Sequence, residues 1–451
     1  MTDSVLIVGS GLAGLTAAQD CADAGANVII VERAAVAGGR FAAAATDDSA
    51  AVDGIAVPKL AALSARDNVE LIVLAELEAL QGRPGNFTAT ITEQARFVTD
   101  TCTRCNRCRA VCPSVSPNEF DEGLTYRKAI YTPLAETCPP EYVIDIDSCL
   151  NRPPNYLPCN RCIEVCDDDS IHFDLPLQTT HQRTVATVIV ATGCDNANGT
   201  ALQDRGYGTH PDIVTTAELQ RMLLAPGPTG GFVAKPSNEE YPDSILLTLD
   251  QLTPYALDAT ASLVRQLLAQ NIERVAVLVT QQPPADASLA VLPAGSEICF
   301  GMLRKIEGQG SSVMVSWADF GSNRLPQEQF DLVVLDAGAQ PAAGMDRLAA
   351  TLQLELTPEG FAAAPVAEQP WASSQPGIYL AGSVAGPVAA ANTVRAAKAA
   401  ALAALGQLDP RLLRADFVPG VAEEQHKIAA QEDALRERIE RALYALLDRS
   451  G

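Results

Sequence analysis

Apolar residues near the start of the chain fall into two short runs separated by a helical pattern. The first run is Val5–Val8, and the glycine motif GSGLAG then opens an alanine-rich stretch with helical spacing. The second run, in NVIIVE, ends at Glu32. Short apolar runs on either side of a helical stretch are typical of buried parallel strands joined by a helix. The opening residues therefore predict one complete βαβ unit.

The same pattern resumes further along the chain, after an interruption. VELIVLAELEAL and GNFTATITEQARFV predict strands of an accessory sheet, and the apolar run over 185–190 predicts a buried strand that rejoins the first sheet. SILLTL, DATASLVRQLLAQ and RVAVLVT predict a second α/β unit. Near the C-terminus, one face of a charged helix is predicted to carry Ile428, Leu435, Ile439, Leu443 and Leu446. That helix is a candidate covering helix, dimer contact or partner contact.

These patterns predict an α/β protein in which a Rossmann-type nucleotide-binding domain is interrupted by a cysteine-bearing insert. The predicted division is 1–98 for the first part of that domain, 99–175 for the insert, 176–200 for the return strand, 201–330 for the second Rossmann-like unit, 331–408 for the last part of the first domain and 409–451 for a C-terminal arm and helix.

Composition excludes several classes of protein. The longest apolar stretches fall far short of the roughly 20 residues that span a bilayer, and MTDSVLIVGS lacks the basic region and cleavage site of a secretion signal. We therefore expect a cytoplasmic protein without direct membrane insertion, in which the cysteines are reduced. The formal net charge of -23 disfavours nucleic acid as a partner and leaves protein partners or simple solubility.

The glycine motif indicates a dinucleotide site because of where it lies. It follows a buried strand and opens a helix, whose N-terminal amides and dipole can hold a pyrophosphate. Glu32 ends the second strand, where a ribose hydroxyl binds in such domains. An ordinary strand-to-helix turn is the alternative. The motif alone leaves both FAD and NAD open as the ligand.

Eight of the cysteines have the spacing of iron–sulfur ligands. In bacterial ferredoxins, three thiolates at two-residue gaps bind one 4Fe–4S cluster, and a fourth, followed by proline, binds a neighbouring cluster. The first set here, which Pro113 follows, matches that run: Cys102, Cys105, Cys108 and Cys112. The second set keeps the last gaps and stretches the first: Cys149, Cys159, Cys162 and Cys166. Zinc is the alternative, although zinc ligands usually occur as separated pairs.

By symmetry with ferredoxins, the two sets exchange their last members. One predicted cluster is held by Cys102, Cys105, Cys108 and Cys166, and the other by Cys112, Cys149, Cys159 and Cys162. Cys138 is an alternative ligand to Cys149. The remaining cysteines, Cys21, Cys194 and Cys299, are predicted to be small buried hydrophobic residues. The four histidines fall in no metal or triad pattern.

The second α/β unit lacks the feature that a nicotinamide nucleotide needs. A glycine-lined turn lets pyrophosphate approach the backbone. The sequence has no glycine from Phe232 to Ala294, and its first turn reads TLDQLTPYALDAT. We expect this unit to have kept its sheet and lost its nicotinamide site, so that electrons enter and leave through protein partners.

Several longer stretches carry a family resemblance. VIVATG and GIYLAGSVAG resemble the strand-end motifs of flavoproteins with two dinucleotide-binding domains, which favours FAD over NAD. Together with the cysteines, VERAAVAGGR, GRPGNFTATI, PNEFDEGLTYRKAIYTP and YVIDIDSCL resemble the family of heterodisulfide reductase A subunits over most of the chain. Within that family the resemblance is greatest to the A subunit of the quinone-interacting membrane-bound oxidoreductase complex.

The resemblance implies a two-dinucleotide-binding-domain flavoprotein fold with an inserted α+β ferredoxin domain carrying two 4Fe–4S clusters. It implies FAD in the first domain and electron transfer with B and C subunits of the heterodisulfide reductase or quinone-interacting type; a homodimer is a further candidate. Carried onto this chain, the FAD contacts are Gly9, Ser10, Gly11, Leu12, Ala13, Gly14, Glu32, Arg33, Gly38, Gly39, Arg40, Ala191, Thr192, Gly193, Gly382, Ser383, Pro387, Ala390 and Thr393. No side chain stands out as a general acid or base, although Arg40 and Lys398 are cations near the flavin motifs.

The sequence differs from the family in two places, and three alternative functions remain open. The second α/β unit carries no cysteine cluster motif, and AAAATDDSAAVDGIAVPKL replaces a cysteine- and aromatic-rich segment. One alternative is a glutamate-synthase small-subunit type, which places its cysteines before the first glycine motif and keeps a nicotinamide-site glycine turn. The others are a non-catalytic scaffold with a decayed flavin site and a stand-alone NAD(P)H oxidoreductase.

Overall fold

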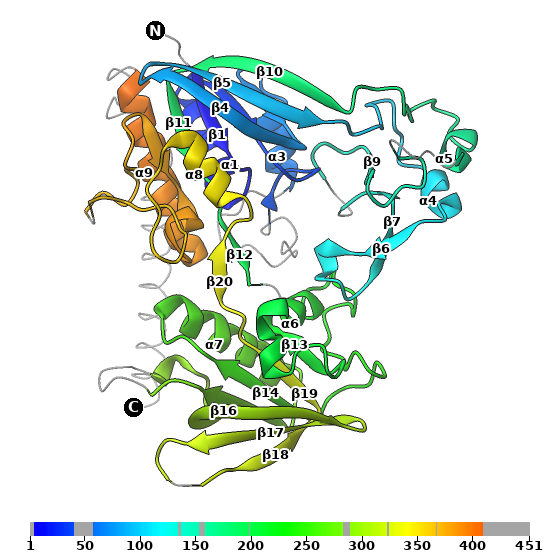
Figure 1. The fold of residues 1–451 in the computed structure, drawn as a ribbon, viewed down its shortest axis with the longest axis vertical. Coiled ribbons are helices and arrows are strands. Elements are labelled where there is room, and N and C mark those ends of the chain that lie inside the picture. The colour runs from blue at the N-terminus through cyan, green and yellow to red at the C-terminus, as the bar shows by residue number, and fades with distance from the viewer. Residues whose placement is uncertain are drawn as a thin grey trace, which may run out of the picture.

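The computed structural model describes residues 4–39, 57–133, 137–152, 158–197, 199–282, 289–322, 324–366 and 368–408. Figure 1 shows three lobes: a nucleotide-binding body, a cysteine lobe beside it, and an α/β unit below both. Among the helices in these ranges, none has the length and apolar character needed to cross a membrane. Arg40, the alanine-rich stretch after it and the predicted C-terminal helix lie outside the described residues.

A five-stranded parallel sheet forms the centre of the nucleotide-binding body. Its strands, in spatial order, are β21 (Ile378–Leu380), β11 (Thr187–Val190), β1 (Ser4–Val8), β2 (Asn27–Val31) and β3 (Val69–Ile72). The strand predicted to rejoin the sheet does so, since β11 pairs with β1 along Val5–Val8. The sequence placed VELI in the accessory sheet, which is wrong: β3 pairs in parallel with β2. Its apolar residues are as suitable for a buried parallel strand as for a strand of the accessory sheet, so the pattern could not show to which sheet the strand belongs.

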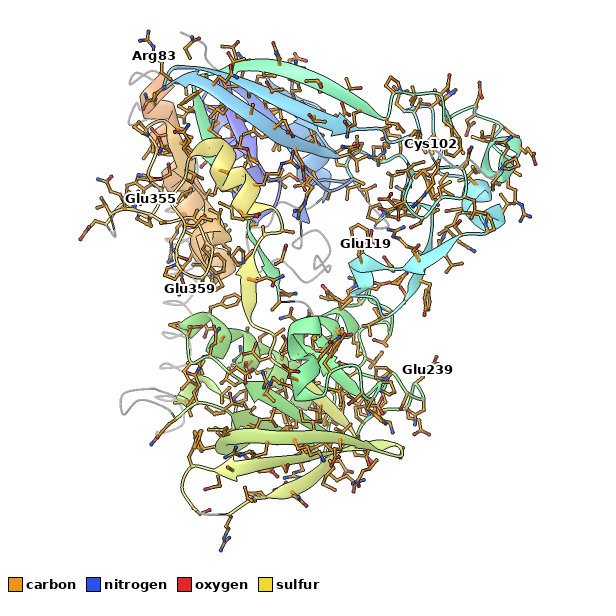
Figure 2. The ribbon with its side chains drawn as sticks, viewed as in Figure 1. Arg83, Cys102, Glu119, Glu239, Glu355 and Glu359 are labelled. Carbon is orange, nitrogen blue, oxygen red and sulfur yellow. The ribbon has the colours of Figure 1, made fainter. Side chains whose placement is uncertain are left out.

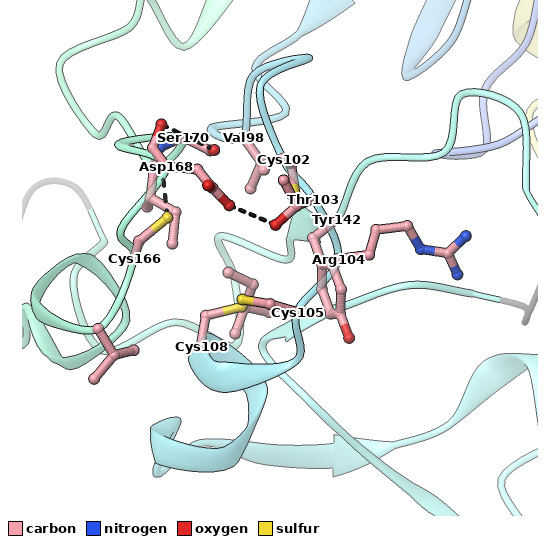
Figure 3. A pocket seen from close by; sticks show the side chains of 13 residues that line it. Val98, Cys102, Thr103, Arg104, Cys105, Cys108, Tyr142, Cys166, Asp168 and Ser170 are labelled. Atoms are coloured by element: carbon pink, nitrogen blue, oxygen red, sulfur yellow. Dashed lines mark hydrogen bonds between the residues drawn. The ribbon is translucent and has the colours of Figure 1, made fainter.

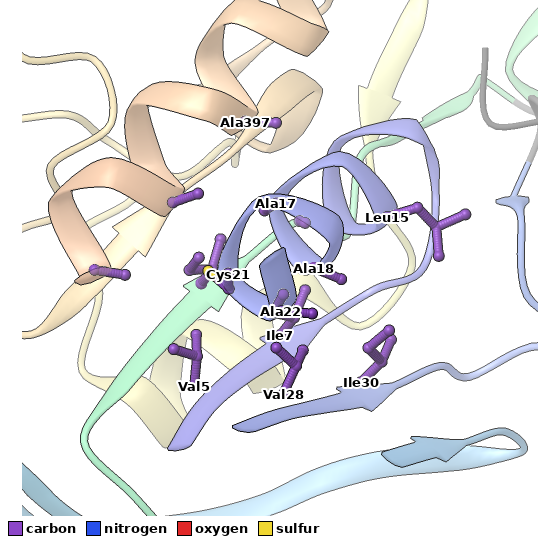
Figure 4. Close-up of a cluster of buried hydrophobic side chains, with 14 of the residues drawn as sticks. Val5, Ile7, Leu15, Ala17, Ala18, Cys21, Ala22, Val28, Ile30 and Ala397 are labelled. Atoms are coloured by element: carbon purple, nitrogen blue, oxygen red, sulfur yellow. The ribbon is translucent and has the colours of Figure 1, made fainter. Parts of the chain in front are cut away.

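Two alanine-rich helices cover one face of this sheet. They are α1 (Leu12–Asp23) and α9 (Ala390–Leu408), and α3 (Val57–Ser64) adds Leu60 and Leu63 to the same core. Ala17 and Ala18 on α1 and Ala397 and Ala400 on α9 are fully buried (Figure 4). Small side chains let the two helix backbones approach closely over the strands, which places the glycine motif and the start of α9 at the same end of the sheet.

Asp20 on α1 is mostly buried at the edge of this helix pair, and burial raises its pKa to about 6, opposed by the nearby charge of Lys398. Because the raised pKa means that folding disfavours the carboxylate, folded protein binds more protons than unfolded protein between pH 3.8 and about 6. The folded state therefore loses stability as the pH rises through that window.

We expect Asp20→Asn to raise the free energy of unfolding at pH 8 by about 1–3 kcal/mol. The gain should shrink as the pH falls below about 6 and become small below pH 3.8, where both states are largely protonated. Chemical denaturation across this pH range measures the effect. Glu359→Gln, at an exposed carboxylate (Figure 2), is the matched control and should change little. A gain at Asp20 that does not depend on pH would contradict the assignment.

An antiparallel accessory sheet carries the cysteine lobe. It consists of β4 (Ala75–Arg83), β5 (Asn86–Gln94) and β10 (Gln178–Val185), with β5 in the middle, and α8 (Met345–Leu352) packs against it. Strands β5 and β10 pair without interruption from Phe87 opposite Val185 to Gln94 opposite Gln178. The chain therefore leaves and re-enters the body at adjacent points, and residues 95–177 form the lobe between them.

The cysteine lobe is built from short elements. They are α4 (Arg107–Val111), β6 (Val115–Pro117), η2 (Glu119–Asp121), β7 (Tyr126–Lys128), β8 (Ile130–Tyr131), β9 (Val143–Ile144) and α5 (Arg161–Glu164). Strand β6 pairs with β7, and β8 pairs with β9. Phe97, Val98, Ile130, Tyr142 and Ile144 form a small core with the cysteines around it. The cysteines therefore pack against a small apolar core.

The second α/β unit contains a seven-stranded sheet in the order β13-β19-β14-β15-β16-β17-β18. Its elements are η3 (Gly199–Arg205), β13 (Ile213–Thr215), α6 (Thr216–Met222), β14 (Ser244–Leu249), α7 (Pro254–Ala269), β15 (Arg274–Val279), η4 (Leu289–Val291), β16 (Glu297–Gln309), β17 (Ser312–Asp319), β18 (Gln327–Phe330) and β19 (Leu332–Leu335). The predicted boundary at 330 is wrong, because β19 pairs in parallel with both β13 and β14. The chain returns to the body through β20 (Ala339–Pro341), which pairs with β12 (Cys194–Asn196).

A buried ion pair joins the cysteine lobe to the second α/β unit. Arg221 on α6 donates to the Asp121 carboxylate at 2.8 Å, and both side chains are largely buried. The other oxygen of Asp121 accepts from Asn118 and Thr125 within the lobe. Because both carboxylate oxygens have partners, the lobe is held in a defined place between the other two units.

Candidate functional site

Two glycines of the N-terminal motif are required by close backbone contacts. A β-carbon on Gly14 would lie 1.9 Å from the carbonyl oxygen of Gly9. A β-carbon on Gly9 would lie 2.5 Å from the oxygen of Ala191, and Gly9 also has a φ of +103°. The motif thereby packs the start of α1 directly onto β1 and β11, as the sequence predicted for a dinucleotide fold.

The middle glycine of the motif faces open space. Among the described residues, no heavy atom lies within 4 Å of a β-carbon built on Gly11, which is the N-cap of α1 and has no side chain capping its amides. Gly39 approaches from the other side, since a β-carbon there would lie 3.0 Å from the α-carbon of Gly11. Together with the α1 amides, Gly11 and Gly39 form an open cradle of backbone groups, which fits a pyrophosphate.

Glu32 closes the cradle by contacting Ser10. One carboxylate oxygen accepts from the Ser10 amide at 2.8 Å and from its hydroxyl at 2.6 Å, and the other accepts from the Ala34 amide at 2.8 Å. A carboxylate has about four acceptor positions, so an acceptor remains for a ligand hydroxyl. Gly38 also donates to the Ser10 carbonyl oxygen, which brings the GGR loop to the motif.

The strand-end residues lie around the same cradle. Ala191–Gly193 follow β11 beside Gly9, and Gly382 begins η5 (Gly382–Ala385). A β-carbon on Gly382 would lie 2.7 Å from the side chain of Ala13 and 3.1 Å from that of Thr393. Ser383 lies in η5, Ala390 is the first residue of α9, and Leu12 begins α1. Helix α9 thus begins three residues after Pro387.

Two basic side chains near the motifs, Arg33 and Lys398, interact with groups outside the cradle. The Arg33 guanidinium donates to the backbone oxygen of Ala343, on the connection from the second α/β unit. Lys398 interacts electrostatically with Asp20. Arg40 lies outside the described residues. The described part of the cradle therefore consists mainly of backbone groups.

Four cysteines from both runs surround one cavity in the cysteine lobe. This first cavity is lined by Cys102, Cys105, Cys108 and Cys166, with Val98, Ile130, Ile171 and Tyr142 among the residues behind them (Figure 3). The Ser170 amide donates to the Cys166 sulfur at 3.5 Å. Thr103 donates to Asp168 at 2.5 Å across the mouth of the cavity.

The other four cysteines surround a second cavity. It is lined by Cys112, Cys149, Cys159 and Cys162, with Pro113, Ile144 and Leu150 beside them. Ile130 lines both cavities and is 2% exposed. The cysteines are thus grouped as the exchange between runs predicts, with one apolar side chain between the two groups.

The pKa values of the thiols differ with their burial and their hydrogen bonds. Burial raises the pKa of Cys108 to about 11 and the pKa of Cys162 to about 12. Hydrogen bonds from Arg107 lower the pKa of Cys105, which is exposed at the rim. Buried neutral thiols release protons when a metal binds, so metal loading at these positions is favoured by higher pH.

Cys138, the alternative ligand, lines neither cavity. Its sulfur lies 3.2 Å from the Ser64 hydroxyl, in the core under α3. Cys21 and Cys194 are buried, as predicted for small apolar residues, whereas Cys299 is only partly buried. In the described ranges, no group of three or more His, Cys, Asp or Glu residues is arranged to share a single metal ion. The thiols instead stand around the walls of the two cavities.

An ion pair lies at the strand ends of the second α/β unit, where a nucleotide would bind. In open parallel sheets, ligands bind beyond the carboxyl ends of strands at the point where the strand order reverses, here β14 and β19. Arg205 pairs with Asp250 there, at 3.0 Å through one nitrogen, and Thr280 donates to the same carboxylate at 2.6 Å. Burial raises the pKa of Asp336, which follows β19.

Comparisons with known proteins relate the chain to one domain family and to several curated relatives. Residues 7–63 match the NAD(P)-binding Rossmann-like domain family. The chain is 33% identical over 449 residues to the iron–sulfur A subunit of the CoB–CoM heterodisulfide reductase of Methanocaldococcus jannaschii, covering 91% of this chain and 66% of that one. It is 29% identical to the A subunit of the H2:CoB–CoM heterodisulfide,ferredoxin reductase of Methanothermobacter thermautotrophicus, covering 88% and 63%.

The chain therefore spans slightly less than two thirds of the length of these curated relatives. Among solved structures, the thioredoxin reductase of Lactococcus lactis aligns with a TM-score of 0.47 at 13% identity, covering 90% of this chain and 98% of that one. The thioredoxin reductase of T. acidophilum aligns with a TM-score of 0.44 at 16% identity, covering 89% and 97%.

Proposed function

We propose that this chain, which belongs to the family of heterodisulfide reductase A subunits, is an oxidoreductase component that binds FAD and two iron–sulfur clusters and passes electrons between them. The observation that carries the proposal is the grouping of eight cysteines into two cavities that share Ile130. Flavin exchanges electrons singly or in pairs whereas each cluster carries one, so the combination links two-electron and one-electron transfer.

The residues of the cradle fit the FAD dinucleotide. We assign the pyrophosphate to the α1 amides at Gly11, because the space beside this residue is open and the helix N-terminus favours negative charge. We assign the ribose to Glu32, which Ser10 holds in place. The remaining sequence-predicted contacts in Ala191–Gly193 and at the start of α9 supply backbone groups around the same cradle.

The cysteine cavities fit clusters of the 4Fe–4S type. We assign one cluster to Cys102, Cys105, Cys108 and Cys166, and the other to Cys112, Cys149, Cys159 and Cys162. Four thiolates around an apolar cavity are the donor set for such a cluster. Among the described residues, Ile130 is the one side chain that both linings share, so an electron would have a short path between the two. Residues 95–177 would then be a ferredoxin-like domain inserted between β5 and β10.

We propose that the electrons leave or enter through partner subunits in the cytoplasm. The relatives are named as A subunits of reductase complexes, so B and C subunits of the heterodisulfide reductase or quinone-interacting type are the candidate partners. Exposed apolar side chains on the cysteine lobe support a protein contact there: Leu150, at the rim of the second cavity, is 40% exposed, and Tyr126, on the β6–β7 hairpin, is 72% exposed.

The protein should not use NADH or NADPH as its electron donor. In the crevice of the second unit, the Arg205–Asp250 ion pair and Thr280 occupy the strand ends, and no glycine lines the β14–α7 turn. Anaerobic addition of NADPH or NADH should leave the flavin absorbance band unchanged, while dithionite should bleach it.

The same anaerobic preparation tests the whole proposal. Purified protein should contain about one FAD and about eight iron atoms with matching acid-labile sulfide. Zinc in place of iron would exclude the clusters, and protein that takes up no FAD would support the scaffold alternative. Bleaching by NADPH would favour the NAD(P)H oxidoreductase alternatives, including the glutamate-synthase type.

A further inference from the structure

Arg96 bridges the nucleotide-binding body and the first cysteine cavity. Its guanidinium donates to the backbone oxygens of Ala35 at 2.6 Å, Glu141 at 2.6 Å and Tyr142 at 3.0 Å. Ala35 lies in the loop that leads from Glu32 to Gly38 and Gly39. The side chain of Tyr142 lines the first cavity. Arg96 therefore connects, through hydrogen bonds, the proposed flavin loop with the wall of the proposed first cluster site.

The charge of Arg96 has no ion-pair partner among the described residues. No carboxylate in those ranges lies within 4.0 Å of it, whereas the partly buried Arg127 pairs with Glu119 and Asp145, and Arg221 pairs with Asp121. Burial lowers the pKa of Arg96, and Glu141 and the thiols of Cys102 and Cys138 act electrostatically in the opposite direction. A guanidinium removed from water without a paired carboxylate needs other negative charge nearby.

We propose that Arg96 is a positioning residue whose cation stabilises the extra electron on the first cluster and so raises the reduction potential of that cluster. The inference rests on the proposed function. The cluster gains one electron and the reduced flavin loses one; Arg96 stays protonated throughout, because a guanidinium does not release its proton in proteins. Its three hydrogen bonds to backbone oxygens fix the cation between the flavin loop and the cavity wall.

The test is a potentiometric titration followed by EPR. It uses a Cys159→Ala background, which leaves the four assigned ligands of the first cluster intact. We expect Arg96→Gln to make reduction of the first cluster about tenfold less favourable, a shift of about 59 mV for a one-electron couple. Arg96→Lys keeps the positive charge but cannot make all three hydrogen bonds. It should change the equilibrium constant for reduction of the first cluster by less than about threefold.

Arg109→Gln is the matched control. Arg109 directly follows Cys108 but is exposed, so solvent screens its charge. Its loss should change the equilibrium constant for reduction of the first cluster by less than about threefold. The proposal is overturned if Arg96→Gln and Arg96→Lys give equal potentials, because the role is then structural. If Arg96→Gln prevents cluster loading, loading of Arg96→Lys supports a need for the charge, and failure of both contradicts it. If the unsubstituted chain shows no cluster signal, the proposed function itself fails.

Discussion

Protein carrying Cys166→Ala should lose the same iron–sulfur signal as protein carrying Cys108→Ala, although Cys166 belongs to the second run of cysteines. Both side chains line the first cavity, whereas Cys162, four residues before Cys166, lines the second. A cluster that loses one of four thiolate ligands at a partly buried site is held weakly or not at all. Each substitution should therefore remove about half of the iron and acid-labile sulfide, about four atoms of each per chain.

Iron and sulfide analysis with EPR of the reduced protein measures this result. Cys112→Ala and Cys162→Ala should remove the other signal, and the double variant Cys108→Ala/Cys162→Ala should remove both. Cys138→Ala is the control, because this cysteine contacts Ser64 and lines neither cavity. If the Cys166 and Cys162 variants lose one common signal while the Cys108 and Cys112 variants lose the other, the proposed exchange of ligands between the runs is wrong.

A single methyl group on Gly11 should abolish tight FAD binding and leave the fold intact. A β-carbon there meets no atom of the part of the chain that the structure describes within 4 Å, and the φ of -70° suits any residue. The methyl group would instead enter the space that we assign to the pyrophosphate. We expect Gly11→Ala to weaken FAD binding at least tenfold, equivalent to about 1.4 kcal/mol, while the free energy of unfolding of FAD-free protein falls by about 1 kcal/mol or less.

Gly14→Ala provides the contrast. Its β-carbon would lie 1.9 Å from the Gly9 carbonyl oxygen, so the helix must shift away from the strand. This variant should lose stability and FAD together. Thermal unfolding of FAD-free protein and fluorescence titration with FAD separate the two effects. If Gly11→Ala binds FAD as tightly as the original chain, the pyrophosphate does not lie against this residue.

The strong local patterns in the sequence predicted the parts of the fold that depend on neighbours in the chain. The first βαβ unit is present, with β1 and β2 parallel and α1 opened by the glycine motif. The return of the chain through β11 was also predicted, because a fully apolar run needs a strand buried on both faces. The two groups of cysteines around the cavities are those expected from the spacing of ferredoxin cysteines.

Long-range pairing could not be read from the sequence. The apolar pattern of β19 fits a buried strand in either parallel sheet, and only its pairing with β13 and β14 assigns it to the second unit. Arg96 gave no signal at all, since a lone arginine after a strand is usually an exposed cation. Its three acceptors are backbone oxygens from segments distant in sequence, which no residue pattern marks.

The way in which the cysteine lobe joins the body makes it exchangeable as a unit. Gln94 and Gln178 are directly paired partners at the end of the β5–β10 ladder, so their α-carbons are only about 5 Å apart. A turn of about two residues could join these strands as a simple hairpin and leave the parallel sheet untouched. The ladder is thus a natural grafting point, through which an ancestral flavoprotein could gain or lose an electron-carrying module in one insertion or deletion.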